Sequence, residues 1–320
     1  MTSAVGTLER IESFHPERAV DVAEVADRLG LSHARQRLFS KIHGLRTLRL
    51  DPDMGLFDLV LPAARAVLHA VAEPAQVRYV IYAHTSQAVT PAELDAADVI
   101  RESLGLDRAE AFGLTQQNCA AGLGAIDIAV ELLRADGGGD ARALVVTGEK
   151  PFTPRAQLIP NIAIMGDAGA ACLVAVGGAG HPVLSYACRT LGEYADVIAL
   201  TEEQMQQFGQ EYPRVLAEVM RTAADRAGLD FDDIDLVIPH NVNMYSWRQI
   251  TKEMDIPAER VFLDNVARFS HCFVSDVLLN FTTLRQAGRL VEGRHYMLVS
   301  VGFGATFAAM VIRYHSPAGN

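Results

Sequence analysis

The sequence predicts a layered α/β fold made of two pseudo-repeated halves. The first observation is an alternation of short, β-branched apolar runs with segments of helical periodicity. We expect strands at residues 77–85, 143–149, 170–176, 234–241, 260–266, 296–304 and 307–314, and helices at 56–72, 91–104, 119–134, 203–227, 244–254 and 276–288. This alternation favours helices packed on a sheet of largely parallel strands.

The second observation is internal similarity between residues 1–177 and 178–320. The run "YVIYAHT" followed by a helix matches "DLVIPHN" followed by a helix, which puts His84 and His240 at equivalent strand ends. In the same order, "QNCAAGLGAIDIAVELL" matches "SHCFVSDVLLNFTTL", and "LVVTGEK…GDAGAACLVAV" matches "LVSVGFGATFAAMVIRY". No Pro- or Ser-rich linker separates the halves, so we expect a shared core and a ligand site between them.

Composition limits the class of protein. Half of the 320 residues are hydrophobic, and the formal net charge of −11 argues against a nucleic-acid partner. No apolar run is long enough for a bilayer, and the N-terminal segment lacks the pattern of a secretory signal. The four cysteines have no metal-ligand or disulfide-like spacing. We therefore expect a cytoplasmic enzyme with no membrane contact and no metal.

Cys119 is a candidate nucleophile. It begins a predicted helix, where the helix dipole and free N–H groups favour a thiolate. The small residues that follow, "AAGLGA", leave room for an acyl group at the sulfur. A small buried core cysteine is the alternative interpretation.

Histidine and asparagine side chains follow the second of the matching strands. His240, Asn241 and Asn243 close the run "VIPHNVN", at the strand end where ligand sites of α/β folds form. His84 could line the same cavity from the first half, although a histidine bonded to local backbone is the simpler interpretation. Asn241, Asn243 and His84 are thus candidate substrate-binding residues.

His271 and Asp276 lie five residues apart across a turn into a helix, in "SHCFVSD". In the first turn, a carboxylate can cap the helix without any further function. It can also reach back to one imidazole nitrogen, as the acid of a nucleophilic triad does.

Two glycine-rich turns, "MGDAGAACLV" and "GFGAT", match no phosphate-binding pattern. They favour tight turns that present a backbone N–H, of the kind that helps to form an oxyanion hole beside Cys119.

Taken in order, these segments resemble the ketoacyl-ACP synthase III group of thiolase-fold condensing enzymes, over nearly the whole chain. "KIHGLRTLRL" is similar to an early Arg-rich segment of that group, "NCAAGLGAIDIAVELLRADGGGDARALVVTGE" to its nucleophile helix and strand, "IMGDAGAACLV" to its GDGAGA hairpin, "PHNVN" to its HQAN motif, and "LVSVGFGATFAAMVIR" to its C-terminal strand turn.

The resemblance implies a five-layered α-β-α-β-α fold, usually a homodimer, with an acyl-enzyme on Cys119. It implies an oxyanion hole formed by the N–H groups of Cys119 and Gly304. It also implies a coenzyme A or phosphopantetheine thioester as substrate, delivered as acyl-CoA or by an acyl carrier protein, with no tightly bound cofactor.

One departure from the group bears on function. Where the group has "GNTS", this chain has "SHCF", so His271 replaces an asparagine that assists decarboxylation. In one interpretation Cys119, His240 and His271 resemble the Cys-His-His set of elongating enzymes, and the chain is a decarboxylating β-ketoacyl synthase. In the other, Cys119 with the H-x4-D pair His271–Asp276 resembles an acyltransferase offshoot found in antibiotic (polyketide) biosynthesis.

We favour the acyltransferase. It moves an acyl group through acyl-Cys119 to a hydroxyl or thiol of a small-molecule acceptor, with His271 as base, Asp276 as its orienting group and His240 binding acyl group or acceptor. Arg35 and Arg37, beside Lys41, are candidate coenzyme A contacts, and Arg248 lies where the group places a basic patch for a carrier protein. A non-catalytic partner subunit is a third hypothesis, disfavoured by the intact Cys119, His240 and His271.

Overall fold

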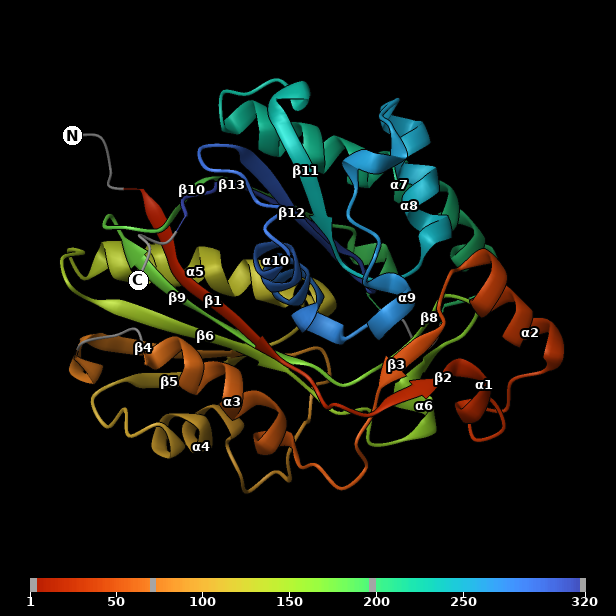
Figure 1. The fold of residues 1–320 in the computed structure, drawn as a ribbon, viewed down its shortest axis with the longest axis horizontal. Helices are drawn as coiled ribbons and strands as arrows, with labels where there is room; N and C mark the ends of the chain where they lie inside the picture. Colours follow the sequence, from red (N-terminus) through yellow and green to blue (C-terminus); the bar gives the residue numbers. More distant parts are fainter. Residues whose placement is uncertain (1–4, 70–72, 196–199, 317–320) are drawn as a thin grey trace.

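The computed structural model describes residues 5–69, 73–195 and 200–316, and its centre is one nine-stranded mixed sheet (Figure 1). In spatial order its strands are β11 (Ile234–Pro239), β12 (His295–Gly302), β13 (Thr306–Arg313), β10 (His181–Thr190), β1 (Gly6–Phe14), β9 (Gly169–Val176), β6 (Arg142–Gly148), β4 (Val77–Ala83) and β5 (Glu110–Leu114). Two small two-stranded sheets accompany it, β2 (Ala19–Asp21) with β3 (Thr47–Arg49) and β7 (Leu158–Ile159) with β8 (Ala163–Ile164).

The strand order is the same in both halves of the large sheet. Strands β1-β9-β6-β4 run outward on one side, and β10-β13-β12-β11 run outward on the other. The two sets meet where β1 pairs with β10 through Thr7–Pro182 and Leu8–His181. This mirrored order is the one expected of a duplicated unit. The division at residues 177 and 178 stays a prediction, and it falls in the turn between β9 and β10.

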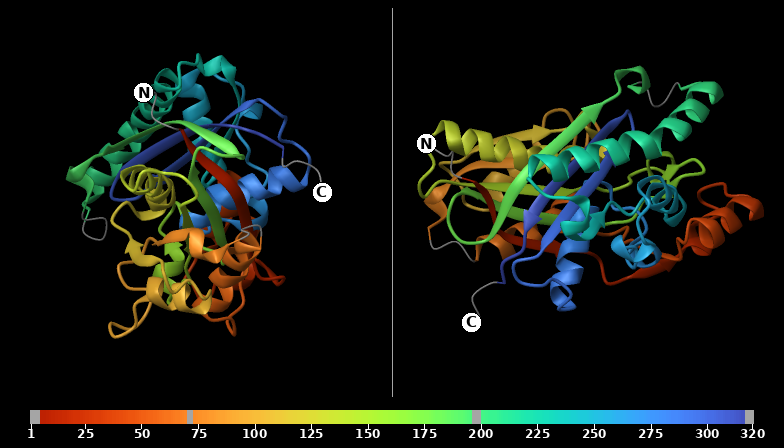
Figure 2. Two further views of the ribbon diagram at one scale, coloured as in Figure 1. Left: turned by 90° about the vertical axis from the view of Figure 1, so that its left-hand side faces the viewer. Right: turned by 90° about the horizontal axis from the view of Figure 1, so that it is seen from above.

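The helices are α1 (Val22–Val25), α2 (His33–Arg37), α3 (Leu56–Leu68), α4 (Ala96–Ser103), α5 (Ala121–Ala135), α6 (Pro154–Gln157), α7 (Glu202–Arg226), α8 (Met244–Met254), α9 (Val266–Phe269) and α10 (Asp276–Gln286). Helices α5 and α10 lie between the two halves of the sheet, α3 and α4 cover one outer face, and α7 and α8 cover the other (Figures 1 and 2).

Side-chain alternation along the strands produces these layers. In β6, Ala143 and Val145 face the central helices, whereas Leu144 and Val146 face α3 and α4. In β12, Tyr296 and Leu298 face the central helices, whereas Met297 and Val299 face α7 and α8. Because successive side chains of a strand point to opposite faces, each half-sheet is buried on both sides. The result is the predicted five-layer α-β-α-β-α arrangement.

The prediction of largely parallel strands is wrong. Only β11–β12, β4–β5 and β4–β6 pair in parallel, and the other five neighbouring pairs are antiparallel. Strands β1, β5 and β10 were not among the expected strands, and β1 and β10 form the antiparallel centre of the sheet. Charged residues interrupt the apolar pattern of β1, "GTLERIESF", so its strand character depends on its neighbours.

The strand expected at residues 260–266 is also wrong. This segment is a 3₁₀ turn, Ala258–Arg260, followed by a loop that enters α9, and it pairs with the sheet through an isolated bridge between Val261 and Val237. Its apolar residues Val261 and Phe262 are buried without a strand ladder. The helix expected at 91–104 begins only at Ala96, and residues 70–72 of the helix expected at 56–72 lie outside the described residues.

In the described ranges, no helix is long and apolar enough to cross a membrane.

Candidate active site

Cys119 lies in a tight 3₁₀ turn, Asn118–Ala120, that leads directly into α5. Its side chain is buried, with 5% of the residue surface exposed. Ser300 on β12 donates a hydrogen bond from Oγ to the Cys119 carbonyl at 2.8 Å. A Cβ at Gly302 would lie 1.8 Å from the Gln117 carbonyl oxygen, so only glycine allows β12 to approach this turn so closely. The thiol is therefore held at a helix N-terminus, as predicted.

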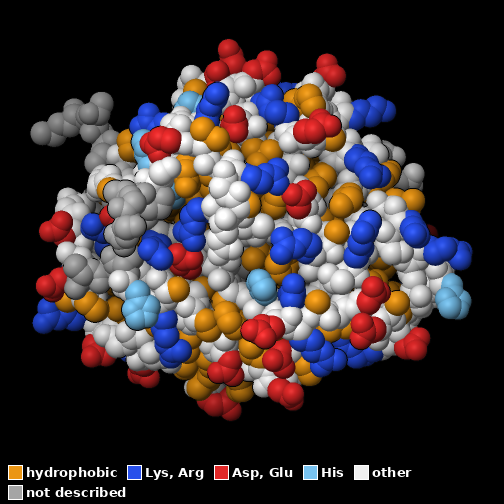
Figure 3. All heavy atoms as spheres, in the orientation of Figure 1, with side chains coloured by type: hydrophobic (Ala, Val, Ile, Leu, Met, Phe, Trp, Pro, Cys, Tyr) orange, Lys and Arg blue, Asp and Glu red, His pale blue; other side chains and the backbone are white. Residues whose placement is uncertain are grey.

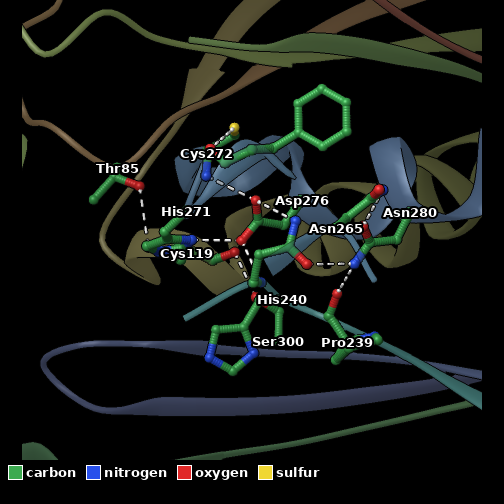
Figure 4. A network of polar contacts seen from close by, with 12 residues as sticks. Thr85, Cys119, Pro239, His240, Asn265, His271, Cys272, Asp276, Asn280 and Ser300 are labelled. Carbon is green, nitrogen blue, oxygen red and sulfur yellow. Dashed lines mark hydrogen bonds and ion pairs between the residues drawn. The ribbon is translucent and has the colours of Figure 1, made fainter. Parts of the chain in front are cut away.

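His271, 152 residues later in the chain, contacts the thiol. Its Nε2 lies 3.2 Å from Cys119 Sγ, with both residues buried (Figure 4). Thr85 Oγ1 lies 3.6 Å from the same sulfur. The backbone of His271 is held by the hairpin that includes β8: its N–H donates to the Ile164 carbonyl, and its carbonyl accepts from Gly166 N–H. A thiol and an imidazole from distant parts of the chain thus meet in this site.

Asp276 orients His271. Its Oδ2 lies 2.5 Å from His271 Nδ1 and accepts a hydrogen bond from the backbone N–H of Asn241 at 2.5 Å. Its Oδ1 accepts from Cys272 N–H at 2.7 Å (Figure 4). No hydrogen bond to an N–H of its own helix is found for this carboxylate among the described residues. The base–orienter interpretation therefore describes the geometry better than the capping interpretation.

Buried amide side chains support Asp276 from behind. Asn241 Nδ2 approaches Asp276 Oδ1 at 3.3 Å, and the Asn241 side-chain oxygen accepts from Asn280 Nδ2 at 2.8 Å. Asn280 also donates to the Pro239 carbonyl and accepts from Asn265 (Figure 4). These three asparagines are fully buried. A closed network of this kind fixes the direction of the carboxylate.

The charge state of His271 follows from two opposed effects. Burial lowers its pKa, but the negative charges of Asp276 and Cys119 and their hydrogen bonds raise it, and the net pKa of His271 is well above its usual value. The imidazole therefore holds its proton at neutral pH.

His240 lies beside this pair but is not part of the hydrogen-bonded triad. Its ring centroid is 6.0 Å from that of His271, and its Nε2 lies 3.4 Å from the Tyr212 hydroxyl. Burial and the charge of His271, opposed by the Val299 carbonyl, lower the pKa of His240 to about 3. His240 is consequently neutral at physiological pH.

A cavity of about 310 Å³ opens onto the triad. It is lined by His43, Cys119, Ile159, Asn161, Ile162, Met205, Phe208, Gly209, Tyr212, Pro213, His240, Val242, Asn243, Tyr245, Ser246, Gln249, His271, Val301 and Phe303. Of the predicted residues, Cys119, His240, His271 and Asn243 thus share one cavity. The side chain of Asn243 also caps α8 by accepting from Ser246 N–H at 2.7 Å, and it donates to the Ile162 carbonyl.

Other predicted residues lie elsewhere. Asn241 does not line the cavity, because it is fully buried behind Asp276. His84 lines a separate hollow, where it stacks on Tyr82. Arg35, Arg37 and Arg248 are exposed on α2 and α8, outside the cavity lining, in a region where Figure 3 shows Lys and Arg side chains.

Gly304 lies in the turn between β12 and β13. The Asn118 side chain donates to the Phe303 carbonyl, which ties this turn to the nucleophile turn. The other glycine-rich segment, "MGDAGA", allows two backbone segments to pack closely. A Cβ at Gly169 would lie 2.3 Å from the Leu59 carbonyl oxygen, so a side chain at this position would collide with α3. Among the described residues, no group of three or more His, Cys, Asp or Glu side chains is arranged to hold a metal ion.

Several residues of the site were not predicted. Tyr212 and Phe208 come from the long helix α7, whose residues 205, 208, 209, 212 and 213 face the cavity at helical spacing. That spacing is visible in the sequence, but it is typical of any helix that packs on a core. Asn280 follows Asp276 by four residues, a spacing that places both on one helix face. His43 is buried in the lining, and no hydrogen bond to its Nδ1 exists within the described part of the chain.

The sequence and the fold of this chain are similar to those of known proteins. Residues 224–314 match the family model of the 3-oxoacyl-[acyl-carrier-protein] synthase III C terminal. The β-ketoacyl-[acyl-carrier-protein] synthase III of Rhizorhabdus wittichii is 29% identical over 80% of this chain and 83% of its own length. That of Staphylococcus haemolyticus is 24% identical over 94% of this chain and 96% of its own length.

Two solved structures share the fold. ChlB3, described as an acyltransferase, has a TM-score of 0.86 at 18% identity, covering 98% of this chain and 99% of its own. The 3-oxoacyl-(acyl carrier protein) synthase III of Pseudomonas aeruginosa has a TM-score of 0.81 at 21% identity, covering 98% of this chain and 100% of its own. In sequence this chain is similar to β-ketoacyl-[acyl-carrier-protein] synthases III, and its fold is the thiolase fold of the two solved structures.

Proposed function

We propose that this protein is an acyltransferase that takes an acyl group from a thioester onto Cys119 and passes it to a hydroxyl or thiol acceptor. The observation that carries the proposal is the linear set Cys119–His271–Asp276, with 3.2 Å from sulfur to imidazole and 2.5 Å from imidazole to carboxylate. This is the geometry of a nucleophile, a base and the group that orients the base.

In the first step, the Cys119 thiolate attacks the thioester carbonyl of the donor. A carbon–sulfur bond forms to Cys119 and the donor's carbon–sulfur bond breaks. The departing thiolate takes the proton from His271, whose raised pKa keeps that proton available at neutral pH. The products are acyl-Cys119, the free donor thiol and a neutral His271.

In the second step, His271 acts as the base. The acceptor hydroxyl or thiol gives its proton to His271 Nε2 as its oxygen or sulfur attacks the acyl carbonyl. The bond to Cys119 breaks, which regenerates the thiolate beside a protonated His271. Asp276 stabilises that protonated state, and its network keeps Nε2 directed at the sulfur.

Decarboxylative condensation is the second candidate. It is favoured by His240, whose ring lies 6.0 Å from that of His271 and which lines the same cavity, and by the synthase names of the sequence relatives. A condensing enzyme makes its carbanion by loss of carbon dioxide, so it needs N–H donors for an enolate oxygen and no base for an acceptor. His271, which is bound to the Asp276 carboxylate, is suited to act as the base for an acceptor. The Nε2 of His240, which a condensing enzyme would direct at the enolate oxygen, already contacts the Tyr212 hydroxyl. We therefore place acyl transfer first.

Further parts of the proposal rest on the family resemblance. The oxyanion hole would use the N–H groups of Cys119 and Gly304, and the donor would be an acyl-CoA or an acyl carrier protein contacting Arg35, Arg37 and Arg248. We place the reaction in the cytoplasm and in antibiotic or other secondary metabolism. A homodimer is supported by β5, which ends the large sheet and leaves an edge for a second copy.

Mass spectrometry of the intact protein, incubated with a panel of acyl thioesters and then with acceptors, tests this proposal. The expected result is a single acyl adduct that is absent from Cys119→Ala and present in Cys188→Ala, which removes the exposed cysteine. The adduct should disappear when the right acceptor is added. Release of carbon dioxide from a malonyl thioester with formation of a β-keto product would instead establish condensation. A Cys119→Ala protein that retains its full biological effect would favour the non-catalytic partner subunit.

A further inference from the structure

A second cavity lies at the end of α10 that is far from the triad. Asp276 begins this helix at the triad, and Arg285, in its last turn, lines the second cavity. The volume is about 550 Å³, and the linings of the two cavities share none of the described residues. The second cavity is lined by Glu9, Arg10, Gly178, Ala179, Gly180, His181, Pro182, Arg285, Arg313, His315 and Ser316. None of these residues takes part in the acyl transfer proposed above.

The arginines of this second cavity are only partly compensated by carboxylates. Arg10 and Arg285 share a single carboxylate, that of Glu12, at 2.8 and 2.7 Å. Arg313 is exposed at the end of β13, and over the ranges 5–69, 73–195 and 200–316 its guanidinium has no ion pair and no hydrogen bond. The lining therefore keeps two positive charges without a counter-ion, one shared by Arg10 and Arg285 and one on Arg313.

The carboxylates closest to these arginines are engaged by other groups. Glu9, which lines the cavity, is paired with Arg142 at 2.6 Å, and Arg142 does not line it. The Glu292 carboxylate lies 2.7 Å from His315 Nδ1 and accepts a hydrogen bond from the backbone N–H of Ser316. Neither carboxylate is free to neutralise the guanidinium groups of the lining.

His181 adds a buried hydrogen-bond donor to the lining. The residue is 4% exposed, and its Nδ1 accepts a hydrogen bond from the backbone N–H of His315 at 3.1 Å. Burial, together with the charges of Arg285 and His315, lowers the pKa of His181 to about 4, so the ring is neutral at physiological pH. A neutral imidazole whose Nδ1 accepts a hydrogen bond holds its proton on Nε2. No partner for this Nε2–H is found among the residues that the structure describes, so an acceptor in the cavity would satisfy it.

We infer that this second cavity binds the phosphate group of a small phosphorylated molecule. A phosphate monoester carries about two negative charges at neutral pH, which match the two positive charges that the lining leaves without a counter-ion. Its oxygens are suited to the forked donors of Arg10 and Arg313 and to the Nε2–H of His181. The cavity is larger than a phosphate group, so the organic part of the ligand also fits. Binding here does not depend on the chemistry at Cys119.

Three small probes separate the phosphate from the rest of a ligand. Isothermal titration calorimetry of the full chain with glycerol 1-phosphate, glycerol and acetate, at one fixed salt concentration, measures their affinities. Glycerol 1-phosphate should bind with a Kd of about 1 mM or lower. Glycerol should not bind, and acetate, with one charge and two oxygens, should bind at least about tenfold more weakly than glycerol 1-phosphate. Equal affinity for acetate and glycerol 1-phosphate, or no binding of glycerol 1-phosphate at about 10 mM, would overturn the inference.

Variants of exposed arginines locate the bound phosphate. Arg313→Gln removes the guanidinium without a counter-ion, and Arg10→Gln leaves Glu12 paired with Arg285. Arg313→Gln should weaken the binding of glycerol 1-phosphate by about tenfold or more, and Arg10→Gln by at least about threefold.

Arg248→Gln is the matched control. It removes the same charge from the exposed surface of α8, outside both cavities, and should leave the Kd within about twofold of the unmodified protein. Equal weakening in all three variants would reduce the effect to net charge and overturn the inference. A loss confined to Arg248→Gln would place the phosphate at α8 and would also overturn it. Thermal unfolding without ligand verifies that each variant is folded.

Discussion

Asp276 Oδ2 lies 2.5 Å from His271 Nδ1 in a space that is closed to solvent, and the same carboxylate is held by the N–H groups of Asn241 and Cys272. This relationship connects the start of helix α10 to the thiol of Cys119 at the start of α5, because the opposite nitrogen of His271 contacts Cys119. It implies that the direction and the proton of His271 depend on Asp276.

Asp276→Asn is expected to lower the rate of acyl transfer by about 10³- to 10⁴-fold, because an amide can donate to Nδ1 and thereby select the wrong tautomer of His271. Stopped-flow measurement of thiol release and thermal unfolding of the same protein check this. Asn265→Asp, in the supporting network but not in contact with His271, is the control for loss of packing. A transfer rate of Asp276→Asn within threefold of the unmodified protein would remove Asp276 from the mechanism.

Acid should destabilise the folded protein through its buried histidines. Burial lowers the pKa of His240 to about 3 and that of His181 to about 4, below the value of 6.5 expected in the unfolded chain. Between the folded and unfolded pKa values, the unfolded state binds more protons than the folded state. The stabilisation that the neutral histidines give to the folded state is therefore complete above about pH 6.5 and is lost as the pH falls. Each histidine contributes a slope of up to about 1.4 kcal/mol per pH unit to the free energy of unfolding.

Urea unfolding between pH 4 and 7 measures that slope. His240→Gln should flatten this slope by the contribution of one histidine. Unchanged slopes in both His240→Gln and His181→Gln would contradict the lowered pKa values of these two histidines. His271 should act in the opposite direction. Its pKa is raised in the folded state, so its stabilisation is present below about pH 6.5 and is lost as the pH rises through the folded value.

Gly302→Ala should impair acylation although Gly302 takes no part in the chemistry. The new Cβ would lie 1.8 Å from the Gln117 carbonyl oxygen, so the turn that holds Cys119 has to move. We expect a loss of at least 10²-fold in the rate of adduct formation, since small displacements of a nucleophile have effects of this size. Gly192→Ala, where the added carbon meets nothing within 4 Å, is the matched control and should acylate normally.

Phe208→Ala should enlarge the cavity and weaken the fold. Phe208 is buried in the wall, with its ring centroid 5.5 Å from that of Phe303 and 5.7 Å from that of Tyr212. Removing a buried phenylalanine typically costs about 3–5 kcal/mol. Chemical denaturation measures this loss, and competition between a short and a longer neutral acyl thioester measures the shift in preference. An unchanged preference would place the acyl group elsewhere in the cavity.

Much of the site was predicted from local patterns. Cys119 at a helix start, and His271 and Asp276 across a turn, are signals carried by residues within one turn of each other, so the sequence contains them directly. Local patterns were misleading in two places. Val261 and Phe262 are apolar and buried like strand residues, but they lie in a loop. Strand β1 has charged residues in its sequence, and its strand structure depends on pairing with its neighbours.

By itself, the sequence predicted most of the helices and outer strands, the similarity of the two halves, Cys119 as candidate nucleophile, and the spacing of His271 and Asp276. Only the tertiary structure decided that Asn241 supports Asp276 instead of facing the cavity, and that α7 forms the wall with Tyr212 against His240. The physical reason is the distance along the chain between the residues that interact. Helix starts and turns depend on neighbouring residues, whereas a cavity is formed by side chains far apart in the chain, whose directions depend on how the two half-sheets pack around α5 and α10.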